Sequence, residues 1–175
     1  MSRQTEANGR LFFALTLPGA LRQRLASWRG GLALSGRMVA PDDLHLTLVF
    51  LGTQPGSNLA LLTGIAANLR GRPFTLCLDQ LRCRRGGLVL LTPRQVPDEL
   101  LALQQGLLQA LSEAGVAADT RPYHPHLTLA RHSRLPANSE ARTFTWRVTR
   151  FALLGSRQQA TGQDYQVLGD WLLRP

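Results

Sequence analysis

Two tetrads of the sequence combine a histidine with a threonine two residues later: His45-Leu46-Thr47-Leu48 and His126-Leu127-Thr128-Leu129. Residues i and i+2 of a β-strand point to the same face, so each tetrad would present an imidazole beside a hydroxyl. Near neutral pH one imidazole can accept a proton while another donates one, without a metal ion. Threonine hydroxyls can donate hydrogen bonds to non-bridging phosphate oxygens. The paired tetrads therefore indicate acid–base chemistry on a phosphodiester.

The basic residues of the chain are all arginine, 20 in number, and the net charge is +9. The absence of lysine excludes a lysine-AMP ligase intermediate, a Schiff-base mechanism and a P-loop phosphate site. A base-composition bias of the source genome would explain arginine in place of lysine. Guanidinium groups nevertheless attract polyanions and contact phosphates in bidentate fashion. The charge suits a nucleic-acid substrate without specifying one.

Both tetrads lie where the pattern predicts strands. Alternation over residues 44–51 places Leu44, Leu46, Leu48 and Phe50 on the core side and His45, Thr47 and Val49 on the other. The other predicted helices pass through Leu21 and Leu25, follow Ser57, and run from Pro97 to Gly115. Strands are predicted at 11–17, 74–78, 88–92, 147–154, 165–168 and 170–173; those at 74–78 and 88–92, separated by the turn 85–87, are expected to be neighbours in a sheet whose strand order the sequence does not reveal.

The repetition of the tetrad, each time within a strand and far apart in the sequence, suggests an internal duplication. We therefore predict an α+β fold in which two similar lobes each contribute one tetrad strand to a shared cleft. The length suffices for one hydrophobic core, and no linker divides the chain, so residues 1–175 are predicted to form a single domain.

Beyond the tetrads, the chain resembles the two-histidine phosphoesterases, and specifically their bacterial RNA 2',3'-cyclic phosphodiesterase branch, first named for 2'-5' RNA ligase activity. The resemblance covers nearly the whole chain. It rests on the segments Leu-Phe-Phe-Ala at 11–14, Asp-Leu-His-Leu-Thr-Leu at 43–48 with Phe-Leu-Gly at 50–52, and Arg-Pro-Tyr-His-Pro-His-Leu-Thr-Leu at 121–129.

This resemblance implies a bilobal, pseudo-symmetric fold with two antiparallel-rich sheets and outer helices around a central cleft. It also implies hydrolysis of RNA 2',3'-cyclic phosphate ends to 2'-phosphate ends, with no cofactor and no divalent metal. His45 and His126 would be catalytic, and Thr47, Thr128 and Arg131 would bind the phosphate. Strict alternation, however, would point Arg131 toward the core.

The remaining residues either have two possible roles or are expected to have a structural role only. His126 is our preferred base and His45 our preferred acid, although the sequence allows the reverse. His124 is expected to support His126, and His132 to be solvated. No metal site is expected, because the histidines and cysteines lack metal-ligand spacing; Cys77 and Cys83 are expected to be reduced. The basic cluster Arg82, Arg84 and Arg85 could contact the RNA backbone or could be an ordinary solvated turn. The aromatic residues Phe12, Phe13, Phe50 and Tyr123 could stack a nucleobase at the mouth of the cleft, but core packing is the expected use of each.

Several other functions fit the same residues. The chain could act on another small cyclic phosphate, such as a cyclic nucleotide or ADP-ribose 1'',2''-cyclic phosphate, or it could bind RNA ends without catalysis. Ligation is a third alternative, and without lysine it would have to reverse the ring opening. No apolar run approaches the roughly 20 residues that span a bilayer, and the polar segment Met1 to Arg10 does not look like a secretory signal. We expect a cytoplasmic monomer that acts on RNA.

Overall fold

A computed structural model describes residues 10–159 and 162–175. The N-terminal stretch judged above for a secretory signal lies, apart from Arg10, outside the described residues. The elements in chain order are β1 (Arg10–Thr16), α1 (Gly19–Gly30), β2 (Arg37–Met38), the short 3₁₀ helix η1 (Pro41–Asp43), β3 (His45–Thr53), α2 (Asn58–Asn68), β4 (Phe74–Leu78), β5 (Gln80–Arg84), β6 (Leu88–Thr92), α3 (Asp98–Glu113), β7 (Leu127–Arg131), β8 (Phe144–Val148), β9 (Arg150–Gln159) and β10 (Gly162–Leu172).

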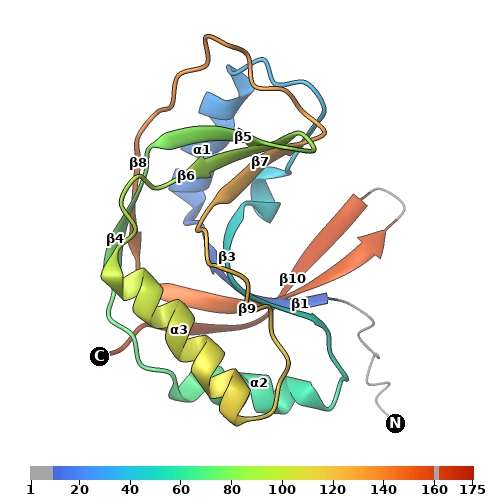
Figure 1. Ribbon diagram of the computed structural model, residues 1–175, viewed down its shortest axis with the longest axis vertical. Helices are drawn as coiled ribbons and strands as arrows, with labels where there is room; N and C mark the ends of the chain where they lie inside the picture. Colours follow the sequence, from blue (N-terminus) through green and yellow to red (C-terminus); the bar gives the residue numbers. More distant parts are fainter. Residues whose placement is uncertain (1–9, 160–161) are drawn as a thin grey trace.

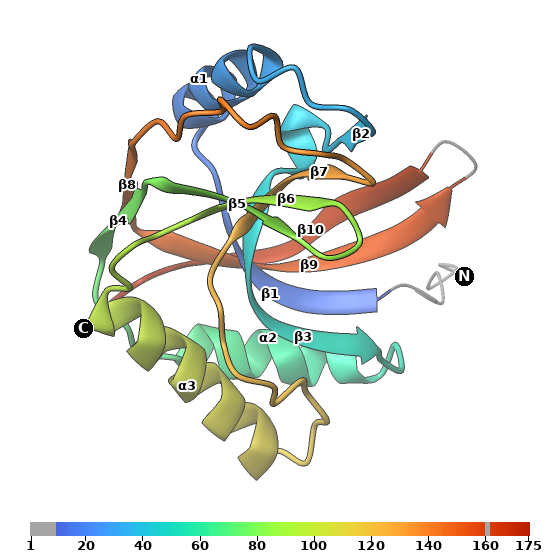
Figure 2. The same ribbon diagram turned by 45° about the horizontal axis from the view of Figure 1, so that its top comes forward.

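The strands form two antiparallel sheets, with the helices outside them (Figures 1 and 2). The larger sheet has the order β10-β9-β1-β3-β7-β6-β5, with β2 attached to β7, and β4 pairs with β8 in the smaller one. The predicted α+β class with antiparallel-rich sheets is therefore confirmed. In the middle of the large sheet, the two tetrad strands β3 and β7 meet at the pair Leu46 and Leu127.

Helices α1 and α3 each follow a strand on one side of the large sheet but pack against the other side, where one side is β10-β9-β1-β3 and the other is β7-β6-β5. α1 follows β1 in the chain, yet it lies beside β7 and contacts β8 (Figure 1). Its Trp28 ring lies 5.1 Å from that of Phe144 in β8. Conversely, α3 follows β6 and packs on β3, on the same side of the molecule as α2. The two tetrad strands are thereby held in one structure, because the helix that follows β1 packs beside β7 and the helix that follows β6 packs on β3.

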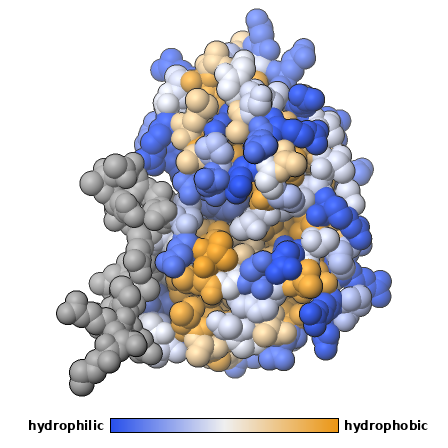
Figure 3. Space-filling model, turned by 180° about the vertical axis from the view of Figure 1, so that it is seen from behind, coloured by the Kyte–Doolittle hydropathy of each residue, from blue (hydrophilic) through white to orange (hydrophobic). Residues whose placement is uncertain are grey.

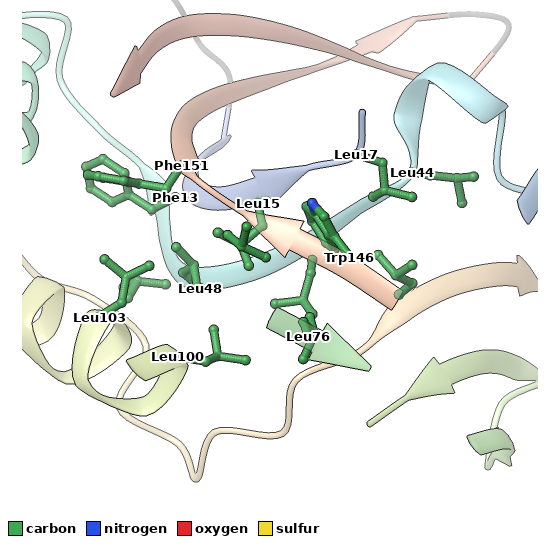
Figure 4. Close-up of a cluster of buried hydrophobic side chains, with 14 of the residues drawn as sticks. Phe13, Leu15, Leu17, Leu44, Leu48, Leu76, Leu100, Leu103, Trp146 and Phe151 are labelled. Atoms are coloured by element: carbon green, nitrogen blue, oxygen red, sulfur yellow. The ribbon is translucent and has the colours of Figure 1, made fainter. Parts of the chain in front are cut away.

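The main hydrophobic core lies between the sheets and the helices. Leu100 and Leu103 of α3 point toward Leu48 of β3 and toward Phe13 and Phe151 in the large sheet (Figure 4). These five side chains are at most 2% exposed. Their burial stabilises the strand that carries His45, since fully burying one such side chain contributes roughly 1.5–3 kcal/mol.

Several predicted strands differ from the structure in pairing or extent. The strand at 74–78 pairs with β8 rather than with the strand at 88–92, whose hairpin partner is β5. Sequence reasoning missed β5 because Gln80–Arg84 is an exposed, mostly polar edge strand without hydrophobic alternation. The strand predicted at 147–154 is divided between β8 and β9, and the last two predicted strands are one continuous β10 with an irregularity after Val167.

The surface differs between the two ends of the molecule. Viewed from behind, hydrophilic residues dominate the upper part, and hydrophobic residues gather over the lower part (Figure 3). Among the exposed large hydrophobic side chains are Leu59 and Leu61 of α2 and Val167 and Leu172 of β10. In the described ranges, no helix combines the length and hydropathy needed to span a membrane.

Candidate active site

A cavity of about 300 Å³ lies where β3 and β7 meet, and we call it the histidine pocket. It brings together all five residues predicted to act on the phosphate, two of them on β3 and three at or on β7. Its lining comprises Arg37, Met38, Val39, Ala40, Asp43, His45, Thr47, Leu88, His126, Thr128, Arg131 and Tyr165. The lining combines two imidazoles, two threonine hydroxyls and two guanidinium groups, which suits an anionic ligand.

The register between the strands explains how the tetrads face each other. Leu46 lies opposite Leu127 in an antiparallel pairing. Continued by one residue on each side, this antiparallel register would set His45 against Thr128 and Thr47 against His126, on the face away from the leucines. Both imidazoles line the histidine pocket, and the charge of His126 acts on His45.

Each imidazole is oriented in the same way by the backbone before its strand. His45 Nδ1 lies 2.6 Å from the carbonyl oxygen of Asp43, and His126 Nδ1 lies 2.7 Å from that of His124. Because a carbonyl can only accept a hydrogen bond, Nδ1 carries the hydrogen in both rings. Nε2 is then the atom of each ring that can exchange a proton with a ligand.

A bulge at the last residue of each tetrad determines which of the following side chains return to the cleft. The register leaves Leu48 without a partner on β1 and Leu129 without one on β6. Arg131 therefore lines the histidine pocket, although strict alternation points it toward the core. The same device corrects our placement of Phe50 on the core side. That side chain is 37% exposed, and Val49 is buried in its stead.

The environment of the histidines favours their neutral forms. Burial is the main cause that lowers the pKa of His45, and the charges of Arg131 and His126 lower it further, against the raising effect of the Asp43 carbonyl. Burial also lowers the pKa of His126, helped by Arg84, Arg131 and His124 and opposed by the His124 carbonyl. The lowered pKa values of both rings favour the neutral imidazoles in the free protein, and a bound phosphate anion would favour protonation of one of them.

Aromatic rings hold the His45 imidazole in place. The ring of Phe12 lies 4.9 Å from it, and that of Tyr165 lies 5.0 Å from it edge-on. Sequence reasoning assigned no role to Tyr165, because β10 enters the cleft only through its pairing with β9 at the edge of the sheet. No comparable ring contact is found for His126 in the part of the chain that the structure describes, so the two histidines differ in their surroundings.

A loop before β3 closes another side of the histidine pocket and was not predicted. Its Arg37 is paired with Arg131 where β2 joins β7. Gly36 (φ +77°) allows this approach, because a Cβ there would clash with the carbonyl oxygens of His132 and Arg131. Arg29 of α1, itself 4% exposed, anchors the same loop by donating hydrogen bonds to the carbonyls of Val39 and Leu129, at 2.5 and 3.1 Å.

The other residues considered from the sequence lie at varying distances from the pocket. His124 contributes its carbonyl to His126, while His132 is exposed. Tyr123 is half-buried and donates a hydrogen bond from its hydroxyl to the Thr47 carbonyl, at 3.2 Å, which ties the approach to β7 onto β3. Phe12 and Phe13 are buried, and Arg84 lies near His126.

Cys77 is half-buried and Cys83 is exposed, and both are free. Within residues 10–159 and 162–175, no group of three or more His, Cys, Asp or Glu side chains is arranged to hold a metal ion.

Comparisons by family model, by sequence and by structure all relate the chain to the same group of proteins. The model of the 2'-5' RNA ligase superfamily matches residues 17–160. The RNA 2',3'-cyclic phosphodiesterase of Escherichia coli (strain K12) is 36% identical over 169 residues, which cover 94% of this chain and 96% of that protein. The crystal structure of E. coli LigT in apo form is 34% identical, with a TM-score of 0.86 and coverage of 95% of this chain and 98% of that one. E. coli LigT complexed with 3'-AMP has a TM-score of 0.83 at 34% identity, covering 94% of this chain and 97% of that one.

Proposed function

The chain belongs to the 2'-5' RNA ligase superfamily, and from that premise we propose that it hydrolyses 2',3'-cyclic phosphate ends of RNA to 2'-phosphate ends. In this proposal His45 and His126 are the acid and the base, and Thr47, Thr128 and Arg131 bind the phosphate. The relatives named RNA 2',3'-cyclic phosphodiesterase support the reaction, and the geometry of the histidine pocket supports the residue roles.

One observation carries the proposal. His45 and His126 line the same small pocket, and each uses Nδ1 to donate a hydrogen bond to the backbone. Two imidazoles that line one cavity and are oriented alike by the backbone suit a reaction in which one group takes a proton and another gives one. A structural role for either histidine alone would not require the second to face it.

The reaction follows from in-line displacement at phosphorus. Nε2 of His126 takes a proton from water while the water oxygen forms a bond to phosphorus. The bond from phosphorus to O3' breaks, and Nε2 of His45 donates its proton to that oxygen. The bond to O2' stays intact, so the product carries a 2'-phosphate and a free 3'-hydroxyl. Thr47, Thr128 and Arg131 stabilise the charge on the non-bridging oxygens, where donors contribute most in the transition state.

We propose that this reaction needs no divalent metal, because the two imidazoles and Arg131 supply both proton transfer and charge stabilisation. The test is an RNA oligonucleotide with a 2',3'-cyclic phosphate end, incubated with the protein in excess EDTA, with the product identified by its phosphate position. We expect full turnover to a 2'-phosphate. Turnover that requires an added metal, or a 3'-phosphate product, would contradict the proposal.

Ligation belongs to the same proposal. If the 5'-hydroxyl of a second RNA replaces water as the nucleophile, the same base takes its proton, the same acid protonates O3', and a 2'-5' linkage forms without ATP; the acid and base exchange roles when that linkage is cleaved again and the ring re-forms. Water at its normal concentration favours hydrolysis. Because every residue assigned a role lies on one chain, we propose that the monomer is active. Its RNA substrate and its two free cysteines suit the reducing cytoplasm.

A further inference from the structure

A second cavity, larger than the histidine pocket, opens beside it. Its volume is about 640 Å³, and we call it the arginine pocket. The two cavities share Thr47 and Arg131, which are proposed to bind the phosphate, and His126, which is proposed as the base. A ligand whose terminal phosphate is held there can therefore extend into both cavities, and the arginine pocket has room for more than the attacking water.

The wall of the arginine pocket farthest from β3 comes from the edge strand β5. Arg82 lies opposite Leu90 of β6, and Leu90 lies opposite Thr128. Arg82 and Arg84, two residues apart on β5, thus share the face of the sheet that carries the second tetrad. Of these two, Arg84 lines the arginine pocket, and its charge acts on His126.

The arginines around this cavity differ in whether a neighbouring side chain already neutralises or binds their guanidinium group. Arg121, on the opposite side, donates hydrogen bonds from Nε to both carboxylate oxygens of Asp119, at 3.0 and 2.9 Å, and the two charges largely cancel. Arg82 donates to the Gln80 side chain at 2.8 Å. Among the described residues, no carboxylate lies within ion-pair distance of Arg84. Arg84 is therefore a cation of the arginine pocket that no carboxylate neutralises, and it lies near His126.

The two cavities also differ in their apolar lining. Tyr165, Met38 and Leu88 give the histidine pocket surfaces that suit a ribose and a base. At the arginine pocket, Phe50 is the exposed aromatic side chain and lies on the same face as Thr47. The arginine pocket thus offers an aromatic face on one wall and a cation on another, and single-stranded nucleic acid binds where a base can stack and a nearby phosphate can pair with a cation.

We propose that the arginine pocket binds the penultimate nucleotide of the RNA, with Arg84 contacting the phosphate that joins it to the terminal nucleotide. This inference rests on the proposed function, which places the cyclic phosphate between the two histidines. Its consequence is a preference for oligoribonucleotide ends over cyclic mononucleotides. A mononucleotide fills the histidine pocket and leaves Arg84 without a partner.

The test compares two substrates that differ by one nucleotide, a nucleoside 2',3'-cyclic phosphate and a dinucleotide with the same cyclic end. Wild-type protein, Arg84→Gln and the control Arg147→Gln are assayed for kcat/KM, each at its own pH optimum because Arg84 influences His126. Arg147 is an exposed strand residue of β8, so its replacement removes the same charge outside both pockets.

We expect the wild type and the control to prefer the dinucleotide. Arg84→Gln should lower kcat/KM for the dinucleotide about tenfold, the effect of losing one partly exposed, charge-assisted contact. It should leave the mononucleotide rate within about twofold and weaken the salt dependence for the dinucleotide by about 0.7 in log–log slope, the amount for one phosphate contact on a single strand.

Two results would overturn the inference while leaving the proposed function intact. The first is an equal wild-type rate on both substrates. The second is an equal loss on both substrates in Arg84→Gln, which would mean that this arginine acts only through His126 or the cyclic phosphate. If the wild type turned over neither substrate, the proposed function would be contradicted, and the inference would fall with it.

Discussion

Phe50 and Arg131 occupy corresponding positions, each five residues after the histidine of its tetrad, and each returns to the cleft face of the sheet because a bulge precedes it. The bulges place Leu48 with Val49, and Leu129 with Ala130, in the interior as adjacent buried pairs. The two strands thus share one backbone device but present different chemistry after it, an aromatic ring in one case and a guanidinium in the other.

The first prediction concerns this guanidinium. Replacing Arg131 by lysine keeps the charge near both histidines but removes the planar pair of donors that matches two phosphate oxygens. We expect Arg131→Lys to lower kcat/KM about tenfold or more, with an unchanged unfolding temperature. Arg134→Lys is the matched control, because Arg134 is exposed and lies outside the histidine pocket. Equal activity of the two variants would contradict a bidentate role for Arg131.

Hydrophobic periodicity predicted the strands that carry the tetrads and the core residues, but it could not predict the bulges. The alternation around His45 and His126 is visible in the sequence, because burial imposes a period of two on any half-buried strand. A bulge, however, depends on which strand lies alongside, and that pairing joins residues far apart in the chain. The sequence therefore left the direction of Arg131 unresolved and misplaced Phe50.

The same limit explains the other differences. β4 and β8 pair across a long stretch of chain, and β5 is a polar edge strand whose side chains show no hydrophobic pattern. Tyr165 reaches His45 only because β10 pairs with β9 at the end of the sheet. Local pattern carries the identity of a strand, while its neighbours are determined by packing over the whole fold.

The second prediction concerns the two threonine hydroxyls. Thr47→Val and Thr128→Val keep the β-branched shape and remove one proposed donor to the phosphate in each case. Because such a donor acts mainly on the charge of the transition state, we expect kcat to fall about a hundredfold in each variant. Thr47→Ser and Thr128→Ser, which restore the hydroxyl, should recover most of this loss. A loss that serine does not repair would point to packing rather than hydrogen bonding.

The third prediction concerns pH. The pKa of each histidine lies below its ordinary value of 6.5. The group that acts as acid therefore loses its proton below that pH in the free protein, and the base stays available to lower pH. The maximum of kcat/KM should lie on the acidic side of 6.5, with activity falling as pH rises through neutrality. The profile of kcat should extend to higher pH, because the bound phosphate favours a protonated imidazole. A kcat/KM maximum at alkaline pH would contradict these surroundings.

The central claim is that His45 and His126 act together on one phosphorus, and a double-mutant cycle tests it most directly. The measurement is kcat on a cyclic-phosphate-ended oligonucleotide for His45→Ala, His126→Ala and the double variant, with His132→Asn as the exposed-histidine control. Each single variant should lose about 10²- to 10⁴-fold, and the double variant should lose little more, because residues that act as a unit are not additive. Losses that multiply in the double variant, or near-full activity in either single variant, would contradict the account.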